Sequence, residues 1–198
     1  MIRKAFIQKR VLELYKQLEK ISYPIEPKKI IPLLHLNSRM ATYKATAEST
    51  GVSVEEIAKL CKSNSGATHY DTENKRCLIL YNDENGRRAL WTQCHEIGHI
   101  ALGHMEVLDE MEGHENKPEY KEYEDEADFF AWNLLAPMPI MRELKIKSSE
   151  ETYNTFGLSE TAAGIHFDRY KRWDEEHRKT AWENDIVKVY KKKNAPAV

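Results

Sequence analysis

A stretch from about Arg87 to His104 has the pattern of an amphipathic helix, and this pattern limits the possible folds more than any other part of the sequence. Its apolar positions recur at intervals of four, three and four, and they are Leu90, Cys94, Ile97 and Ala101. This is the spacing of one buried face of an α-helix. His95 and His99 flank that stripe, and residues four apart lie one turn above each other. The two imidazoles are therefore expected side by side at the edge of a hydrophobic core.

Composition indicates a globular protein with one sizeable core. The chain has 198 residues, of which 41% are hydrophobic and 31% charged, enough for a single compact domain. A net charge of −2 gives no general attraction to nucleic acid or anionic membrane. No apolar run approaches the ~20 residues of a membrane span. Three cysteines without a CxxC pair, and a charged start unlike a signal peptide, lead us to expect a cytoplasmic protein with reduced thiols.

The predicted helix contains the pentapeptide His95-Glu96-Ile97-Gly98-His99, which has the form HExxH. Histidines at i and i+4 can share one metal ion, and Zn²⁺ suits such a pair when a third protein ligand leaves one position open. Mn²⁺ is the second candidate. Glu96 would lie beside the ion, where its carboxylate can take a proton from water. The alternative is a pair of histidines at the surface or in the core, satisfied by hydrogen bonds alone.

A third histidine ligand is not expected. The extended pattern HExxHxxGxxH would require histidine at position 105, which is Met105, and His104 is one residue out of place. An acidic helix predicted from about Lys121 to Leu135, and ended by Pro137, is the remaining source of a ligand.

The apolar side of this second helix indicates which of its carboxylates faces the two histidines. Its stripe consists of Tyr123, Ala127, Phe130, Ala131, Leu134 and Leu135. At roughly 100° per residue, Glu124 lies about 60° from the centre of the stripe and Glu126 about 100° away. We therefore predict Glu124 as the third ligand, with Glu126 as the fallback on an otherwise solvated face. Asp128, one turn beyond Glu124, could accept a hydrogen bond from the second ring nitrogen of a ligand histidine.

The remaining segments predict an α+β fold. Helices are expected at Ile2–Ile21, Lys28–Leu34, Ala41–Glu48, Val54–Lys62, Ser148–Thr155 and from Ser159 to beyond Trp182. Ala67–Tyr70 and Arg76–Tyr81 predict a β-hairpin, and Met105–Tyr120 a loop. We expect a small antiparallel sheet packed on the HExxH helix and the glutamate helix, with N- and C-terminal helices around it. The three parts, 1–65, 66–140 and 141–198, would form one compact unit, and strand Cys77–Tyr81 could pair with an extended substrate.

The segment around Ala47, Gly51 and Ile57 has helix-turn-helix spacing. Its second helix would present Glu55 and Glu56, which repel phosphate. A structural helical hairpin is favoured, and direct DNA binding is not expected.

Five motifs together carry a family resemblance. They are Gly66-Ala-Thr-His-Tyr70, Leu78-Ile-Leu-Tyr-Asn82, Trp91-Thr92, His95-Glu-Ile-Gly-His99-Ile-Ala-Leu-Gly-His104 and Glu124-x-Glu-Ala-Asp-x-Phe-Ala131-x-x-Leu-Leu-x-Pro137. With these the chain resembles the ImmA/IrrE family of metallopeptidases, most closely from Gly66 to Pro137. One departure is Ala136, where relatives often carry Met.

The resemblance implies roles for four residues and a class of substrate. His95 and His99 would be zinc ligands, Glu124 the third ligand and Glu96 the catalytic base. The substrate would be a specific protein, a helix-turn-helix repressor of a mobile element or stress regulon, so that the enzyme acts as an anti-repressor. The rival interpretation is a non-enzymatic regulator that binds a repressor or DNA and keeps a structural metal. Structural zinc sites usually have four protein ligands, whereas this sequence supplies three.

Overall fold

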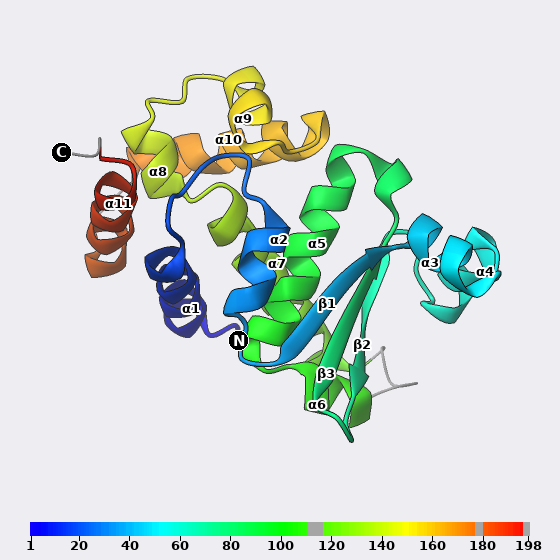
Figure 1. Ribbon diagram of the computed structural model, residues 1–198. Coiled ribbons are helices and arrows are strands. Elements are labelled where there is room, and N and C mark those ends of the chain that lie inside the picture. Colours follow the sequence, from blue (N-terminus) through cyan, green and yellow to red (C-terminus); the bar gives the residue numbers. More distant parts are fainter. Residues whose placement is uncertain (111–116, 177–179, 196–198) are drawn as a thin grey trace.

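The computed structural model describes residues 1–110, 117–176 and 180–195 (Figure 1). The N-terminal part contains α1 (Lys4–Gln17), α2 (Pro27–Ile30), η1 (Ile31–Leu33), β1 (Asn37–Thr42), α3 (Tyr43–Thr50) and α4 (Val54–Leu60). The central part contains β2 (Gly66–Asp71), β3 (Arg76–Tyr81), η2 (Asp83–Asn85), α5 (Arg87–Leu102), α6 (Met105–Glu110) and α7 (Pro118–Leu135). The C-terminal part contains α8 (Met138–Glu143), α9 (Ser149–Phe156), α10 (Glu160–Glu175) and α11 (Ala181–Lys193). Helices with one small sheet confirm the α+β class.

The sheet has three strands in the order β1-β3-β2. The hairpin of β2 and β3 is antiparallel, as predicted, with Thr68 opposite Ile79. The expectation of a purely antiparallel sheet is wrong, because β1 pairs in parallel with β3. The segment Asn37–Thr42 is polar and lacks the apolar alternation by which a strand is recognised. The helix expected from Ala41 starts only at Tyr43, where the Thr42 hydroxyl caps it by accepting from the Ala45 N–H.

Strand β3 is the central strand, so both of its edges are paired. The expectation that Cys77–Tyr81 could accept a substrate strand is therefore wrong. Strand β2 is at the edge of the sheet, and within the described residues no strand pairs with its other side.

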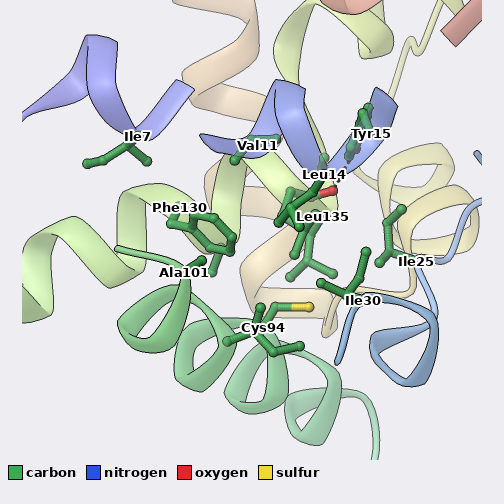
Figure 2. Packing of buried hydrophobic residues seen from close by; sticks show 14 of the residues in the cluster. Ile7, Val11, Leu14, Tyr15, Ile25, Ile30, Cys94, Ala101, Phe130 and Leu135 are labelled. Carbon is green, nitrogen blue, oxygen red and sulfur yellow. Dashed lines mark hydrogen bonds between the residues drawn. The ribbon is translucent and has the colours of Figure 1, made fainter. Parts of the chain in front are cut away.

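Helix α5 lies between the sheet and α7, and α1 packs on α7 from the opposite side (Figure 1). The core between these helices contains Ile7, Val11 and Tyr15 of α1, Cys94 of α5, and Phe130 of α7 (Figure 2). Helices α5 and α7 approach closely at Gly98, where a Cβ atom would lie 3.0 Å from the Phe130 ring and 3.2 Å from the Ala127 carbonyl oxygen. This contact brings the HExxH face of α5 against the acidic helix.

Other differences concern short or interrupted helices. Helix α8 was not predicted, the expected loop Met105–Tyr120 contains α6, and the helix expected from Ser159 onwards is divided into α10 and α11. Parts of the expected loop and of the last expected helix lie outside the described residues, at 111–116 and 177–179. The predicted helical hairpin is present as α3 and α4, and Ser53 and Glu56 form a capping box on α4. Across the described chain, no helix is both long and apolar enough to cross a membrane.

Candidate metal centre

His95, His99 and Glu124 converge between α5 and α7. The Nε2 atoms of the two histidines are 3.0 Å apart. The Glu124 carboxylate lies 3.3 Å from Nε2 of His95 and 3.4 Å from Nε2 of His99. Ligand atoms that are each about 2 Å from one zinc ion lie at most about 4 Å from one another. These three side chains therefore have the spacing and the donor types of a metal-binding site.

The surroundings of His95 favour positive charge. Its Nδ1 lies 2.9 Å from Oδ1 of Asp128, one turn beyond Glu124 on α7. Burial lowers the pKa of His95, but the hydrogen bonds to Asp128 and Glu124 outweigh it and raise the pKa to about 10. The same carboxylates that hold a proton on His95 would stabilise a bound cation.

His99 is more deeply buried than His95. Its pKa lies well below the usual value, because of burial first and then because of the neighbouring rings of His95 and His104. A neutral imidazole is the form that binds a metal ion. The two histidines of the motif thus occupy unlike environments.

Glu96 lies on the cleft side of α5, next to the cluster. Its carboxylate is buried and its Oε2 accepts a hydrogen bond of 2.7 Å from the hydroxyl of Thr68, on β2. Burial raises the pKa of Glu96, while His95 and the Thr68 hydrogen bond oppose that rise. A desolvated carboxylate with a raised pKa is suited to take and return a proton near neutral pH.

A cleft of about 590 Å³ opens onto these residues. One wall is the edge strand β2, from Gly66 to Tyr70, and the end of α4 forms its continuation. Helices α5, α6 and α7 supply most of the other lining residues, including His95, Glu96, His99 and Glu124, and β3 contributes Leu80. His95, Glu96, His99 and Glu124 therefore line one cavity, beside a strand edge that no other described strand covers, whereas Asp128 does not line it.

Glu126 differs from its prediction. The sequence placed it on a solvated face as the fallback ligand, but it is only 4% exposed and does not belong to the metal-binding group. Its carboxylate accepts hydrogen bonds from the backbone N–H of Arg3, at 2.7 Å, and from Nη2 of Arg3, at 2.6 Å. Burial alone would raise its pKa, but the hydrogen bonds from Arg3 lower it to about 2. The helical wheel could not show this, because Arg3 is distant in sequence.

His104 also lies close to the cluster, although the sequence pattern assigned it no role. It is 1% exposed, and its ring lies between His99 and Glu126. Burial lowers its pKa to about 4, although Glu126 opposes the shift. Gly103 was the one feature of the sequence that could have indicated this position of His104. Glycine directly after a helix is typical of a left-handed cap, which reverses the direction of the chain.

Comparison with known families agrees with a catalytic interpretation of this cleft. The model of one peptidase family, Peptidase U49, matches residues 35–139, which is more than half of the chain and includes the whole cluster. The match thus places the protein among the peptidases. The chain belongs to the peptidase U49 family. A search of curated proteins finds no match.

Proposed function

We propose that this chain is a zinc-dependent metalloendopeptidase of the HExxH type, related to the ImmA/IrrE enzymes. The observation that carries the proposal is the convergence of His95, His99 and Glu124 in the cleft, with Glu96 beside them. Membership of a peptidase family supports hydrolysis of a peptide bond as the reaction. The open cleft supports a catalytic metal over a structural one, because three protein ligands leave a position for water or substrate.

The chemistry divides between the metal and the side chains. A zinc ion held by the three ligands would supply Lewis acidity, which polarises a carbonyl group and makes water more acidic. Glu96 would accept a proton from the attacking water as the new carbon–oxygen bond forms. It would then give that proton to the amide nitrogen as the carbon–nitrogen bond breaks. The Thr68 hydroxyl, 2.7 Å from the carboxylate, would orient Glu96 for both transfers.

The substrate is proposed to bind as an extended strand along β2. This strand is at the edge of the sheet and also forms a wall of the cleft. A peptide that pairs with its free edge would pass directly over Glu96 and the cluster, and backbone pairing of this kind is a common mode of peptide recognition. By resemblance, the proposed substrate is a helix-turn-helix repressor. Direct DNA binding is not part of the proposal.

The test is cleavage of a candidate repressor by the zinc-loaded protein, followed by mass spectrometry of the fragments. Glu96→Gln should keep its zinc, because Glu96 is not a proposed ligand, and lose at least roughly 10²-fold in rate. Asp125→Asn, on the exposed side of α7, is the matched control and should cleave as the parent does. A parent protein that binds the repressor without cutting it would instead support the non-enzymatic regulator.

A further inference from the structure

The two histidines of the motif differ in what their Nδ1 atoms face. His95 has a carboxylate there, that of Asp128. His99 has another imidazole, since its Nδ1 lies 3.1 Å from Nδ1 of His104. Two ring nitrogens at this distance can share only one proton, so one of them must donate and the other accept.

The far side of His104 decides which nitrogen donates. Its Nε2 lies 3.1 Å from Oε2 of Glu126 and 3.3 Å from Nη2 of Arg3, which can only donate. Because this Nη2 already donates to Glu126 at 2.6 Å, the shorter contact, with the carboxylate, sets the tautomer. An ionised carboxylate can only accept hydrogen bonds, so Nε2 of His104 carries the hydrogen and its Nδ1 is left as an acceptor. His99 must then carry its own hydrogen on Nδ1. This leaves the lone pair of His99 Nε2 directed at His95 and Glu124, as a metal ligand requires.

Arg3 keeps Glu126 charged and in place. Its backbone N–H and its Nε and Nη2 groups all donate to this carboxylate, at 2.6 to 3.1 Å. Glu126 is almost fully buried, and a buried carboxylate is stable only when it is paired and hydrogen-bonded. Arg3, in the segment before α1, therefore supplies the positive charge that stabilises Glu126 beside His104.

The backbone explains how His104 reaches His99. Gly103 ends α5 with φ of 76°, a left-handed conformation that glycine adopts without strain. The turn returns the chain so that the N–H of His104 donates to the carbonyl of His99, at 2.9 Å. The two rings then meet edge to face, with centroids 5.2 Å apart.

We propose that His104, Glu126 and Arg3 form a positioning chain that fixes the tautomer and orientation of His99, as Asp128 does for His95. The inference rests on the proposed metal site. Residues that hold a ligand histidine through its second nitrogen typically change metal affinity by 10- to 100-fold when removed. His104 is a positioning residue, since it contacts the ligand histidine and not the substrate.

The experiment measures zinc affinity by competition with a chelator for the parent and three variants. His104→Phe keeps a ring but removes the acceptor, and should weaken zinc binding roughly 10- to 100-fold. His104→Asn offers an oxygen to His99 and an amide N–H to Glu126, and should recover most of the loss. His166→Phe is the matched control, because His166 is equally buried and lies outside the cleft. It should bind zinc as the parent does.

A second measurement reads the tautomers directly. Two-bond ¹H–¹⁵N spectra of the parent should show His104 protonated on Nε2 and His99 on Nδ1, and this does not depend on whether a variant folds. His104 protonated on Nδ1 would overturn the proposal. So would unchanged zinc affinity in His104→Phe, or an equal loss in His166→Phe. A parent that binds no zinc would overturn the metal site itself, and the positioning chain with it.

Discussion

His166 shows how burial makes the stability of a protein sensitive to pH through a single side chain. It is 2% exposed, and its Nε2 donates to the carbonyl of Ala136 at 2.6 Å. Its ring stacks on Trp132 with centroids 4.4 Å apart and planes within 5°. Burial lowers the pKa of His166 from 6.5 to about 4, because the charged form is desolvated there. In mild acid, His166 therefore stays neutral in the folded protein but is protonated in the unfolded chain.

This difference predicts a loss of stability in mild acid. Between pH 6.5 and 4 the unfolded chain binds more protons than the folded one, so stability is complete above that window and falls as the pH falls through it. From pH 7 to pH 5 the contribution of His166 to unfolding free energy should decrease by about 2 kcal/mol. His166→Gln should lack this decrease in urea denaturation with chelator present. The exposed His35→Gln is the control, and an unchanged pH dependence in His166→Gln would contradict the account.

Residue-scale predictions agree with the geometry where neighbours on the same helix determine which side of it faces inward. The apolar stripe of α7 favoured Glu124 for the side facing His95 and His99, and the structure brings these three together. Whether they bind metal stays a prediction. The prediction from the stripe that Glu126 lies on a solvated face is wrong, because the Arg3 side chain covers that side of α7. A helical wheel contains no information about a residue that arrives from another part of the chain.

At the scale of elements, the site depends on the close packing of α5 on α7. Gly98 lies at that contact, and Phe130 and the Ala127 backbone lie just beyond it. Both histidines are on α5 and Glu124 is on α7. A side chain at Gly98 would force the helices apart by a few tenths of an ångström, since backbone atoms cannot rotate away.

Gly98→Ala should therefore weaken both the fold and the metal site. Overpacking of this kind typically costs about 1–3 kcal/mol, and separation of the helices should lower zinc affinity as well. Gly164→Ala on α10 is the control, because nothing lies within 4 Å of its added Cβ. It should stabilise the protein by about 0.4–1 kcal/mol and leave zinc affinity unchanged. Chemical denaturation and chelator competition measure the two effects, and a neutral Gly98→Ala would show that the contact does not matter.

Sequence patterns were sufficient to predict the helices and strands whose packing or pairing partners are close in the chain. Helices α5 and α7 follow from apolar periodicity, and the β2–β3 hairpin follows from two extended segments joined by a polar turn. Strand β1 was missed because its six residues are mostly polar and its partner, β3, is more than thirty residues away. Parallel pairing of this type depends on the assembled sheet, which no local pattern describes.

At the scale of the whole molecule, the two ends of the described chain are packed together. Trp182 of α11 donates from Nε1 to the carbonyl of Gln8 in α1, at 2.7 Å, and Asn194 donates to the carbonyl of Ile21, at 2.9 Å. Helix α1 in turn packs on α7, which carries Glu124. The parts 1–65, 66–140 and 141–198 thus share contacts through one buried cluster.

These shared contacts predict that the full chain unfolds in one cooperative transition. The helical signal in far-UV circular dichroism and the fluorescence of Trp91 and Trp182, which lie on α5 and α11, should follow the same urea curve. Replacement of Trp132 and Trp173 by Phe isolates the two reporters. Separate midpoints for the helical signal and the fluorescence would show that the parts are independent domains.

The zinc content of the purified protein tests the proposed metal site without any assumption about the substrate. The parent and the control Asp125→Asn should contain about one zinc ion per chain, because two histidines and one glutamate form a three-ligand site. His95→Ala, His99→Ala and Glu124→Ala should each lose it while remaining folded by circular dichroism. Elemental analysis after dialysis provides the measurement. Full zinc content in these three variants, or none in the parent, would show that His95, His99 and Glu124 do not form a zinc site.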